Sequence, residues 1–204
     1  MTTDYLVIGS GVAGLTFAVK IAEKFSGSNV VIVTKGDEDE SNTKYAQGGV
    51  AIVLDTEEDS FQKHIQDTLI AGDGLCDKSV VEMVIKEGPQ RLKELIVWGA
   101  NFDLDAEGNF ELGKEGGHSE YRVVHHKDIT GYEVERALLQ RVHQLQNVTL
   151  LSHHFAIDLI TEHHLKKVTP KTVSCYGAYV LNEKSGDIIT IHAGSTLLAS
   201  GGIG

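Results

Sequence analysis

The chain has 204 residues, of which 29 are Asp or Glu and 18 are Lys or Arg, and its formal net charge at pH 7 is −11. The charges are mixed along the chain without a basic face, which argues against a nucleic-acid partner. No run of about 18 apolar residues is present, so the sequence predicts neither a transmembrane helix nor a membrane partner. Its two cysteines lack metal-ligand spacing and the N-terminus has no basic leader, so we expect a cytoplasmic protein.

The first 33 residues have the pattern of a strand, a glycine turn, a helix and a second strand. Tyr5–Ile8 and Val30–Val33 are continuous apolar runs, and Val12–Phe25 between them repeats apolar residues with a helical period. This order is the opening βαβ unit of a doubly wound sheet. The predicted fold class is therefore α/β, with a Rossmann-like parallel sheet.

The middle of the chain is expected to be helical and the last third rich in strands. We expect helices over 61–72, over 77–98 in two pieces divided by Gly88-Pro89 and closed by Gly99, and from a capping box formed by Thr130 and Glu133. Beyond residue 147 we expect strands at 148–151, 155–160, 173–181, 188–192 and 196–199. The third and fourth of these would form a hairpin and the last would return to the parallel sheet, which adds a small antiparallel meander.

The turn after the first strand reads Gly9-x-Gly11-x-x-Gly14. In this pattern the first glycine permits a tight turn, the second lets the backbone approach a pyrophosphate, and the third lets the helix pack close to the strand. The first-turn amides and the positive end of the helix dipole then hold the anion. A tight turn that binds nothing is the alternative. We predict a dinucleotide site with contacts from Gly9, Ser10, Gly11, Val12, Ala13 and Gly14.

The carboxylate that usually binds the adenosine ribose is missing from its expected place, which holds Thr34-Lys35. A bound NAD would therefore lack its normal hydroxyl acceptor. Lys35 is compatible with the 2′-phosphate of NADP, and equally with an acceptor on the ribose or adenine of FAD. The first glycine turn alone leaves the choice of cofactor open.

A second glycine-rich stretch, Ser41–Gly49, precedes another apolar run. It has few strong strand or helix formers and offers backbone amides and hydroxyls to a long, extended ligand, which favours FAD over NAD. A flexible surface loop is the alternative interpretation. The expected cofactor contacts in this loop are Asn42, Thr43, Lys44, Tyr45, Ala46, Gln47, Gly48 and Gly49.

These stretches resemble the flavoprotein subunits of the succinate dehydrogenase and fumarate reductase superfamily, and within it they are most similar to the L-aspartate oxidase family. The resemblance covers the whole chain. It is carried by 9–14, 43–49, 67–77, Glu115–Ser119 with Arg122 and His125, and 128–131, and by a closing Ala199–Gly202 that looks like the family's Ala-Thr-Gly-Gly turn.

The resemblance implies FAD as the cofactor. Respiratory relatives bind the flavin covalently through a histidine in the second loop, and Asn42 stands at the matching position. Because an amide has no nucleophilic nitrogen for that bond, the expected FAD is non-covalent. Lys35 matches a lysine of the aspartate oxidases, and Ala156 and Gly201 complete the expected FAD contacts.

The activity that the resemblance implies is oxidation of L-aspartate to iminoaspartate, with hydride transfer to FAD and reoxidation by oxygen or fumarate. This is the first step of de novo NAD synthesis through quinolinate, with a functional link to quinolinate synthase. A soluble fumarate reductase, or a flavin-binding fragment inactive alone, is the alternative. We expect 1–204 to be an incomplete, N-terminal FAD-binding domain without its substrate-capping and C-terminal helical domains.

The resemblance also implies candidate substrate residues. Glu115 would attract the ammonium of aspartate, although outside the motif a solvated loop glutamate is the simpler interpretation. His118, Ser119 and Arg122 would line the reactive face of the flavin, or form a positive surface loop. No Gly-x-Ser-x-Gly elbow accompanies them, so hydrolase chemistry is set aside. The family's substrate arginines and active-site histidine belong to sequence after residue 204, and no general base or metal ligand is assigned here.

Overall fold

The computed structural model describes residues 1–54, 57–165 and 173–202. The chain forms two compact units: unit 1 is Met1–Lys44 with Leu138–Gly204, and unit 2 is Tyr45–Ala137. Each unit has its own sheet, and we describe them separately.

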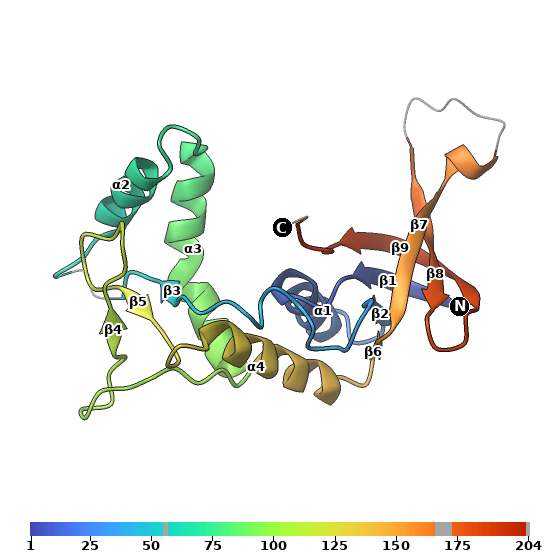
Figure 1. Cartoon of the computed structure of the whole chain (residues 1–204), viewed down its shortest axis with the longest axis horizontal. Coiled ribbons are helices and arrows are strands. Elements are labelled where there is room, and N and C mark those ends of the chain that lie inside the picture. Colours follow the sequence, from blue (N-terminus) through green and yellow to red (C-terminus); the bar gives the residue numbers. More distant parts are fainter. Residues whose placement is uncertain (55–56, 166–172, 203–204) are drawn as a thin grey trace. The chain divides into compact units, whose positions relative to one another are not determined.

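Unit 1 is built on a six-stranded sheet with the strand order β6-β2-β1-β9-β8-β7 (Figure 1). The pairs β6–β2, β2–β1 and β1–β9 are parallel, and the pairs β9–β8 and β8–β7 are antiparallel. The strands are β1 Thr2–Ile8, β2 Val30–Val33, β6 Val148–Leu151, β7 His154–Thr161, β8 Cys175–Asn182 and β9 Ile188–Leu198. The predicted parallel sheet with an antiparallel meander is confirmed, and so is the hairpin of β8 and β9.

Strand β9 differs from the prediction of two separate strands, because it is continuous. Its first half pairs with β8, and from His192 onward it pairs with β1. The predicted gap between 192 and 196 contains Gly194, whose backbone lies close to β1: a Cβ there would lie 3.0 Å from the carbonyl oxygen of Asp4. One strand therefore connects the parallel and antiparallel halves of the sheet.

Helix α1, Val12–Lys24, packs its apolar stripe against β1 and β2. Leu15, Ala18, Val19 and Ala22 are buried there. The sheet's other apolar cluster consists of Leu6, Val31, Val33, Ala178, Val180 and Ile191. Because burial of each Val or Leu side chain is worth about 1.5–3 kcal/mol, these contacts fix the carboxyl ends of β1 and β2 where the glycine turn begins.

Unit 2 contains helices α2, Phe61–Ala71, and α3, Lys78–Val97, and a three-stranded antiparallel sheet in the order β3-β5-β4. Its strands are β3 Val50–Ala51, β4 Leu112–Gly113 and β5 Val123–Val124. Sequence periodicity did not predict β4 or β5, because two residues are too few to display an alternation. Helix α4, Thr130–Gln144, runs from unit 2 into unit 1.

Helix α3 is one continuous helix, so the predicted division at Gly88-Pro89 is wrong. A proline disfavours helical backbone at the preceding residue through contact with that residue's Cβ, which Gly88 lacks. Ile85 and Leu92 are buried on either side of Pro89, so packing favours the unbroken helix. Gly99 follows the end of the helix with φ +100°, as its predicted terminating role requires.

Helix α4 begins at Thr130 as predicted, but without the predicted capping box. The Thr130 hydroxyl accepts from the amide of His126 at 3.1 Å. The Glu133 carboxylate accepts from the Asn101 amide at 2.7 Å and pairs with Arg136. Glu133 thus connects α4 to the segment after α3, in place of closing its own helix end.

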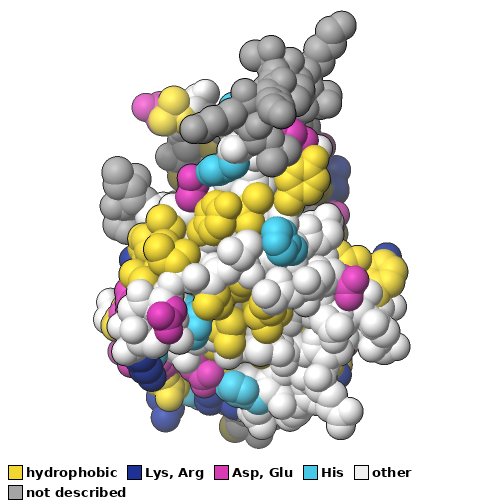
Figure 2. All heavy atoms as spheres, turned by 90° about the vertical axis from the view of Figure 1, so that its right-hand side faces the viewer, with side chains coloured by type: hydrophobic (Ala, Val, Ile, Leu, Met, Phe, Trp, Pro, Cys, Tyr) yellow, Lys and Arg dark blue, Asp and Glu magenta, His cyan; other side chains and the backbone are white. Residues whose placement is uncertain are grey.

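The antiparallel strands of unit 1 expose apolar side chains. Figure 2 shows hydrophobic side chains gathered on the face turned toward the viewer. Phe155, Ile157, Tyr176 and Ile188 of β7, β8 and β9 are each at least 45% exposed. Within the described residues, no helix is long and apolar enough to cross a membrane.

Candidate functional site

The glycine turn lies where the carboxyl ends of β1, β2 and β9 meet in unit 1. The amide of Gly9 donates to Val33 at 2.9 Å, and the amide of Ala199 donates to Ile8 at 2.8 Å. Gly9 has φ +114°, and a Cβ on it would overlap the carbonyl oxygen of Ala199. Gly9 is therefore required by both its backbone conformation and its close neighbour, as the sequence pattern predicted.

Gly11 has a different function from Gly9. It is the N-cap of α1 at an ordinary φ of −73° and makes no side-chain cap. The nearest atom to an added Cβ would be Thr43 Oγ1 at 3.5 Å, so the fold itself leaves room there. A residue without a side chain before the first-turn amides keeps open the approach that a pyrophosphate needs, so this turn fits a dinucleotide.

Substitution of these two glycines should separate folding from cofactor binding. We expect Gly9→Ala to destabilise the apoprotein by about 1–3 kcal/mol, because it combines a left-handed φ with overlap. Gly11→Ala should cost no more than about 1 kcal/mol. Its FAD dissociation constant should nevertheless rise about tenfold or more, because the methyl group displaces the pyrophosphate from the amides. Thermal unfolding and FAD titration measure the two effects, and a Gly11→Ala protein with unchanged FAD affinity would contradict this assignment.

The second glycine-rich loop begins against the first turn. Thr43 Oγ1 accepts from the amide of Val12, in the first turn of α1, at 3.0 Å. Within the loop, the amide of Thr43 donates to Ser41 Oγ at 3.1 Å. Ser10 is buried, and its hydroxyl donates to Thr34 Oγ1 at 3.0 Å, so this side chain joins β1 to β2. The structure thus brings together the two stretches that the sequence predicted to share a ligand.

The other residues of unit 1 that were predicted to contact FAD lie near the carboxyl ends of the strands or are exposed. Lys35 and Asn42 are exposed, whereas Lys44 pairs with Asp39 at 2.7 Å and lowers the pKa of that carboxyl. Ala156 lies on β7 two residues after His154, whose amide donates to Thr34 at 2.8 Å. Ala13 is exposed in α1, Gly14 is buried there, and Gly201 is an exposed glycine with φ +76° after β9.

The second half of the glycine-rich loop belongs to unit 2, where it contacts Glu115. Tyr45, Ala46, Gln47 and Gly48 are exposed, and the carbonyl of Ala46 accepts from Gly131 at 2.9 Å. The amide of Gly49 donates to Glu115 Oε1 at 3.1 Å. The predicted ammonium-binding carboxylate and the predicted flavin loop are therefore direct neighbours within this unit.

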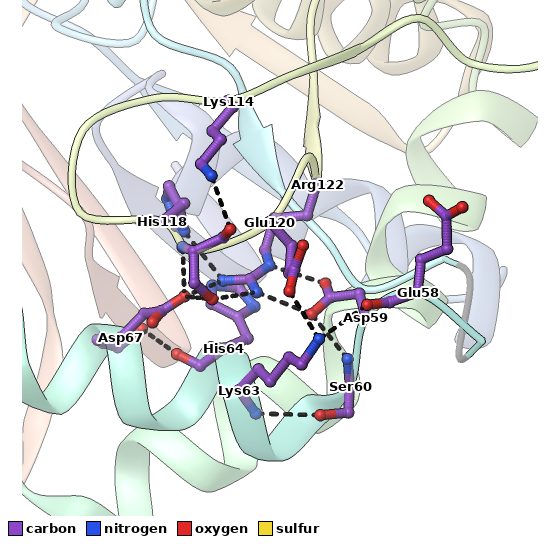
Figure 3. A network of polar contacts seen from close by, with 12 residues as sticks. Glu58, Asp59, Ser60, Lys63, His64, Asp67, Lys114, His118, Glu120 and Arg122 are labelled. Carbon is purple, nitrogen blue, oxygen red and sulfur yellow. Dashed lines mark hydrogen bonds and ion pairs between the residues drawn. The ribbon is translucent and has the colours of Figure 1, made fainter.

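Arg122 directly precedes β5 and is 1% exposed. It lies at the centre of a polar network that includes side chains of α2 (Figure 3). Its Nε and Nη2 donate to both oxygens of Asp59 at 2.8 and 2.7 Å, and Nη1 donates to Asp67 at 2.6 Å. Nη1 also lies 3.3 Å from His118 Nδ1, and Nη2 lies 3.5 Å from Ser119 Oγ. Because its nitrogens are engaged inside the protein, this geometry favours a positioning role for Arg122.

Ser119 follows His118 and is held by the same network. Its amide and its hydroxyl both donate to Asp67 Oδ2, each at 2.8 Å. Burial acts to raise the pKa of Asp67, but the Ser119 amide, Arg122 and the Ser119 hydroxyl outweigh it and lower the pKa to about 2. Asp59 behaves similarly: burial acts to raise its pKa, and the hydrogen bonds from Arg122 and the Ser60 amide lower it overall.

Asp67 should make the stability of unit 2 depend on pH. Its folded-state pKa is below the unfolded value of about 3.9, so its contribution is present above pH 4 and is lost as pH falls toward 2. A depression of this size corresponds to about 2 kcal/mol. We expect Asp67→Asn to lower the unfolding free energy at pH 6, and the difference from wild type to shrink as pH falls from 4 toward 2.

Urea unfolding at a series of pH values measures this, with Asp73→Asn, an exposed carboxylate of the same unit, as the matched control. A difference between wild type and Asp67→Asn that is independent of pH would contradict the assignment.

Sequence analysis did not single out Asp59 or His64. His64 is buried in α2, its Nδ1 has no hydrogen bond among the described residues, and its ring lies 5.4 Å from that of His118. Burial lowers the pKa of His64, and Arg122 and His118 lower it further, which favours the neutral ring. The sequence offered one signal for His64: it is a polar residue next to the apolar stripe of Phe61 and Ile65, and it precedes Asp67 by three positions.

Asp105 lies in the acidic segment 103–108, between α3 and β4. Asp105 Oδ1 accepts from the amides of Glu107 and Asn109 at 3.0 and 2.8 Å, which makes this segment a polar turn. Over the residues that the structure describes, no group of three or more His, Cys, Asp or Glu side chains is placed to hold a metal ion.

Comparisons with known proteins agree with this geometry. A family model described as FAD binding domain matches residues 4–204. The chain is 48% identical over 201 residues to "L-aspartate oxidase, chloroplastic" of Oryza sativa subsp. japonica, covering 98% of this chain and 30% of that protein. It is 43% identical over 206 residues to "L-aspartate oxidase 1" of Ralstonia nicotianae, covering 100% of this chain and 37% of that protein. The chain thus spans about a third of the length of these relatives.

Solved structures show the same fold. A quinol fumarate reductase of E. coli matches with a TM-score of 0.90 at 26% identity, covering 100% of this chain and 33% of that one. Mycobacterium smegmatis Sdh1 in complex with UQ1 matches with a TM-score of 0.88 at 29% identity, covering 100% of this chain and 34% of that one.

Proposed function

The chain belongs to the FAD binding domain family, and from this premise we propose that it is the flavin-holding part of an enzyme that oxidises L-aspartate to iminoaspartate. The observation that carries the proposal is the 48% identity, over 98% of the chain, to a protein named L-aspartate oxidase. The contact between Glu115 and the glycine-rich loop supports it, because it gives a substrate-selecting carboxylate a place beside the flavin loop.

In this proposal the FAD pyrophosphate binds at the start of α1. Gly9 and Gly11 shape the turn, and the backbone amides of the first turn bind the anion. Thr43 holds the second loop to that helix end, and Lys35 with Ala156 and Gly201 contacts the rest of the dinucleotide. The bound FAD supplies the two-electron acceptor for the hydride of the substrate α-carbon.

We propose that the FAD is bound without a covalent link to the chain. Asn42 is exposed in the loop where respiratory relatives carry the linking histidine, and its amide has no nucleophilic nitrogen. Acid precipitation of the full-length protein should release all the yellow colour into the supernatant. Flavin that stays with the precipitated polypeptide would reject this part of the proposal.

Glu115 would recognise the ammonium of aspartate. An exposed carboxylate attracts an α-ammonium and gives no such attraction to succinate, which lacks that group. Its contact with the Gly49 amide fixes the carboxylate at the flavin loop. The chain itself therefore contributes selection of an amino-acid substrate.

The wider setting belongs to the same proposal. Oxygen or fumarate would reoxidise the flavin, and iminoaspartate would pass to quinolinate synthase in de novo NAD synthesis. A cytoplasmic location follows the composition, although the plant relatives are named chloroplastic. Residues 1–204 would be the N-terminal portion of the complete enzyme, with substrate-capping and C-terminal helical domains in the remaining sequence.

A soluble fumarate reductase is the second candidate, favoured by the TM-score of 0.90 with quinol fumarate reductase. A visible spectrum combined with a peroxide assay distinguishes the two on the full-length polypeptide. Yellow protein that produces peroxide with L-aspartate supports the oxidase. Yellow protein that ignores aspartate, but reduces fumarate with a reduced dye, supports the reductase and rejects the oxidase.

A further inference from the structure

The turn Glu115–His118 presents two different polar groups. The amide of His118 donates to the carbonyl of Glu115 at 3.2 Å, which closes the turn, and Gly117 within it has φ +88°. One end of the turn carries the Glu115 carboxylate, which only accepts hydrogen bonds when ionised. The other end carries the half-buried His118 ring, whose hydrogen-bonding function depends on which nitrogen holds the proton.

Arg122 determines the position of that proton. A guanidinium nitrogen can only donate, so His118 Nδ1, 3.3 Å from Arg122 Nη1, must be the acceptor. The proton of the neutral ring is then on Nε2. This nitrogen has no hydrogen bond to the part of the chain that the structure describes, so it is available to a ligand as a donor.

The guanidinium cannot turn away from His118. Its two bonds to Asp59 fix the plane of the group, and the bond to Asp67 fixes Nη1 within that plane. Asp67 also holds the amide and hydroxyl of Ser119, the residue next to His118. Asp59, Asp67 and Arg122 therefore control both the backbone position and the ring of His118.

We propose that His118 binds a carboxylate of the substrate through Nε2–H as a neutral donor, and that Arg122 and Asp67 are positioning residues that fix this tautomer. The proposal rests on the proposed function. An α-amino acid carries an ammonium and a carboxylate, and the turn offers an acceptor at Glu115 and a donor at His118 to match them. His118 is thus a binding residue that takes no proton from the substrate.

The first test reads the tautomer and needs no turnover. Histidine labelled with ¹⁵N in the full-length, FAD-loaded protein is observed by NMR, and the signals that His118→Gln removes are assigned to His118. We expect a bare Nδ1 and a protonated Nε2. A proton on Nδ1 would overturn the proposal. Arg122→Gln, or Arg122→Met if that variant does not fold, removes the donor-only group beside Nδ1 and should allow both tautomers, whereas an unchanged tautomer would remove Arg122, and with it Asp67, from the positioning role.

The second test reads the substrate contact. The amide of glutamine places an N–H near the position of Nε2, and leucine places none. We expect His118→Leu to raise the KM for L-aspartate about 10- to 100-fold with a smaller change in kcat, and His118→Gln to recover most of the loss. Equal losses in the two variants, or a loss confined to kcat, would overturn the binding role. His163→Gln, on an exposed histidine of unit 1, is the matched control.

The two tests separate this inference from the proposed function. A wild-type protein that binds FAD without oxidising aspartate rejects the proposed function together with the substrate contact, and the NMR measurement still decides the tautomer. If the wild-type protein oxidises aspartate but His118→Gln and His118→Leu raise the KM for L-aspartate equally, the proposed function is kept and the inference is rejected.

Discussion

Glu115→Gln should lower kcat/KM for L-aspartate about 10- to 100-fold while leaving fumarate reduction within a few-fold of wild type. The substitution removes the negative charge that would attract the substrate ammonium. It preserves an oxygen that can accept from the Gly49 amide at the position where Glu115 accepts now, at 3.1 Å. The loop contact is therefore retained and only the charge is lost.

Glu115→Ala provides the complementary variant, because it removes both the charge and the loop contact. We expect it to lower aspartate oxidation at least as much as Glu115→Gln and also to weaken FAD binding. Glu111→Gln, an exposed glutamate four residues earlier, controls for a general change of charge. Steady-state kinetics with both substrates measure these effects, and equal losses of the two activities in Glu115→Gln would reject the ammonium-binding role.

Arg122→Met should destabilise unit 2 by about 3–5 kcal/mol, because it leaves two carboxylates without their buried cation. Asp59 and Asp67 are only 6% and 14% exposed, so water cannot fully replace the guanidinium. The matched control is Arg91→Met on α3, whose side chain is 46% exposed and pairs with Glu87 and Glu94. A surface pair of that kind contributes about 1 kcal/mol or less.

Hydrogen exchange in peptides that cover α2 and β5 measures the effect where it should arise. Adding Asp59→Asn and Asp67→Asn to Arg122→Met should recover part of the loss, since no uncompensated charge then remains. If Arg122→Met and Arg91→Met gave equal exchange rates, the network would not stabilise this unit.

The sheet of unit 1 was predictable because its signals are local. The apolar runs of β1 and β2 and the glycine turn between them lie within 33 residues. Each of them predicts its own conformation from neighbouring residues alone. Gly88-Pro89 misled the prediction of α3. A glycine can mark a break or a close approach, and only its packed neighbour, Ile52 for Gly88, distinguishes the two.

The candidate site was only partly predictable because its key contacts join distant parts of the sequence. Glu115 and Gly49 are separated by 66 positions, and Arg122 and Asp59 by 63. Each of these residues was visible as a charge or a glycine, but one sequence does not tell which buried carboxylate meets which cation. Arg122 was therefore predicted to be a candidate substrate residue. Its buried pairing with Asp59 and Asp67 became visible only in the structure.

Anaerobic reduction of the bound flavin tests the central claim most directly. L-Aspartate or succinate is added at the same concentration to the full-length, FAD-loaded protein without oxygen, and the visible flavin band is followed. Our account predicts that L-aspartate bleaches the band and that succinate leaves it unchanged. Bleaching by succinate to the same extent, or no bleaching by aspartate, would contradict it.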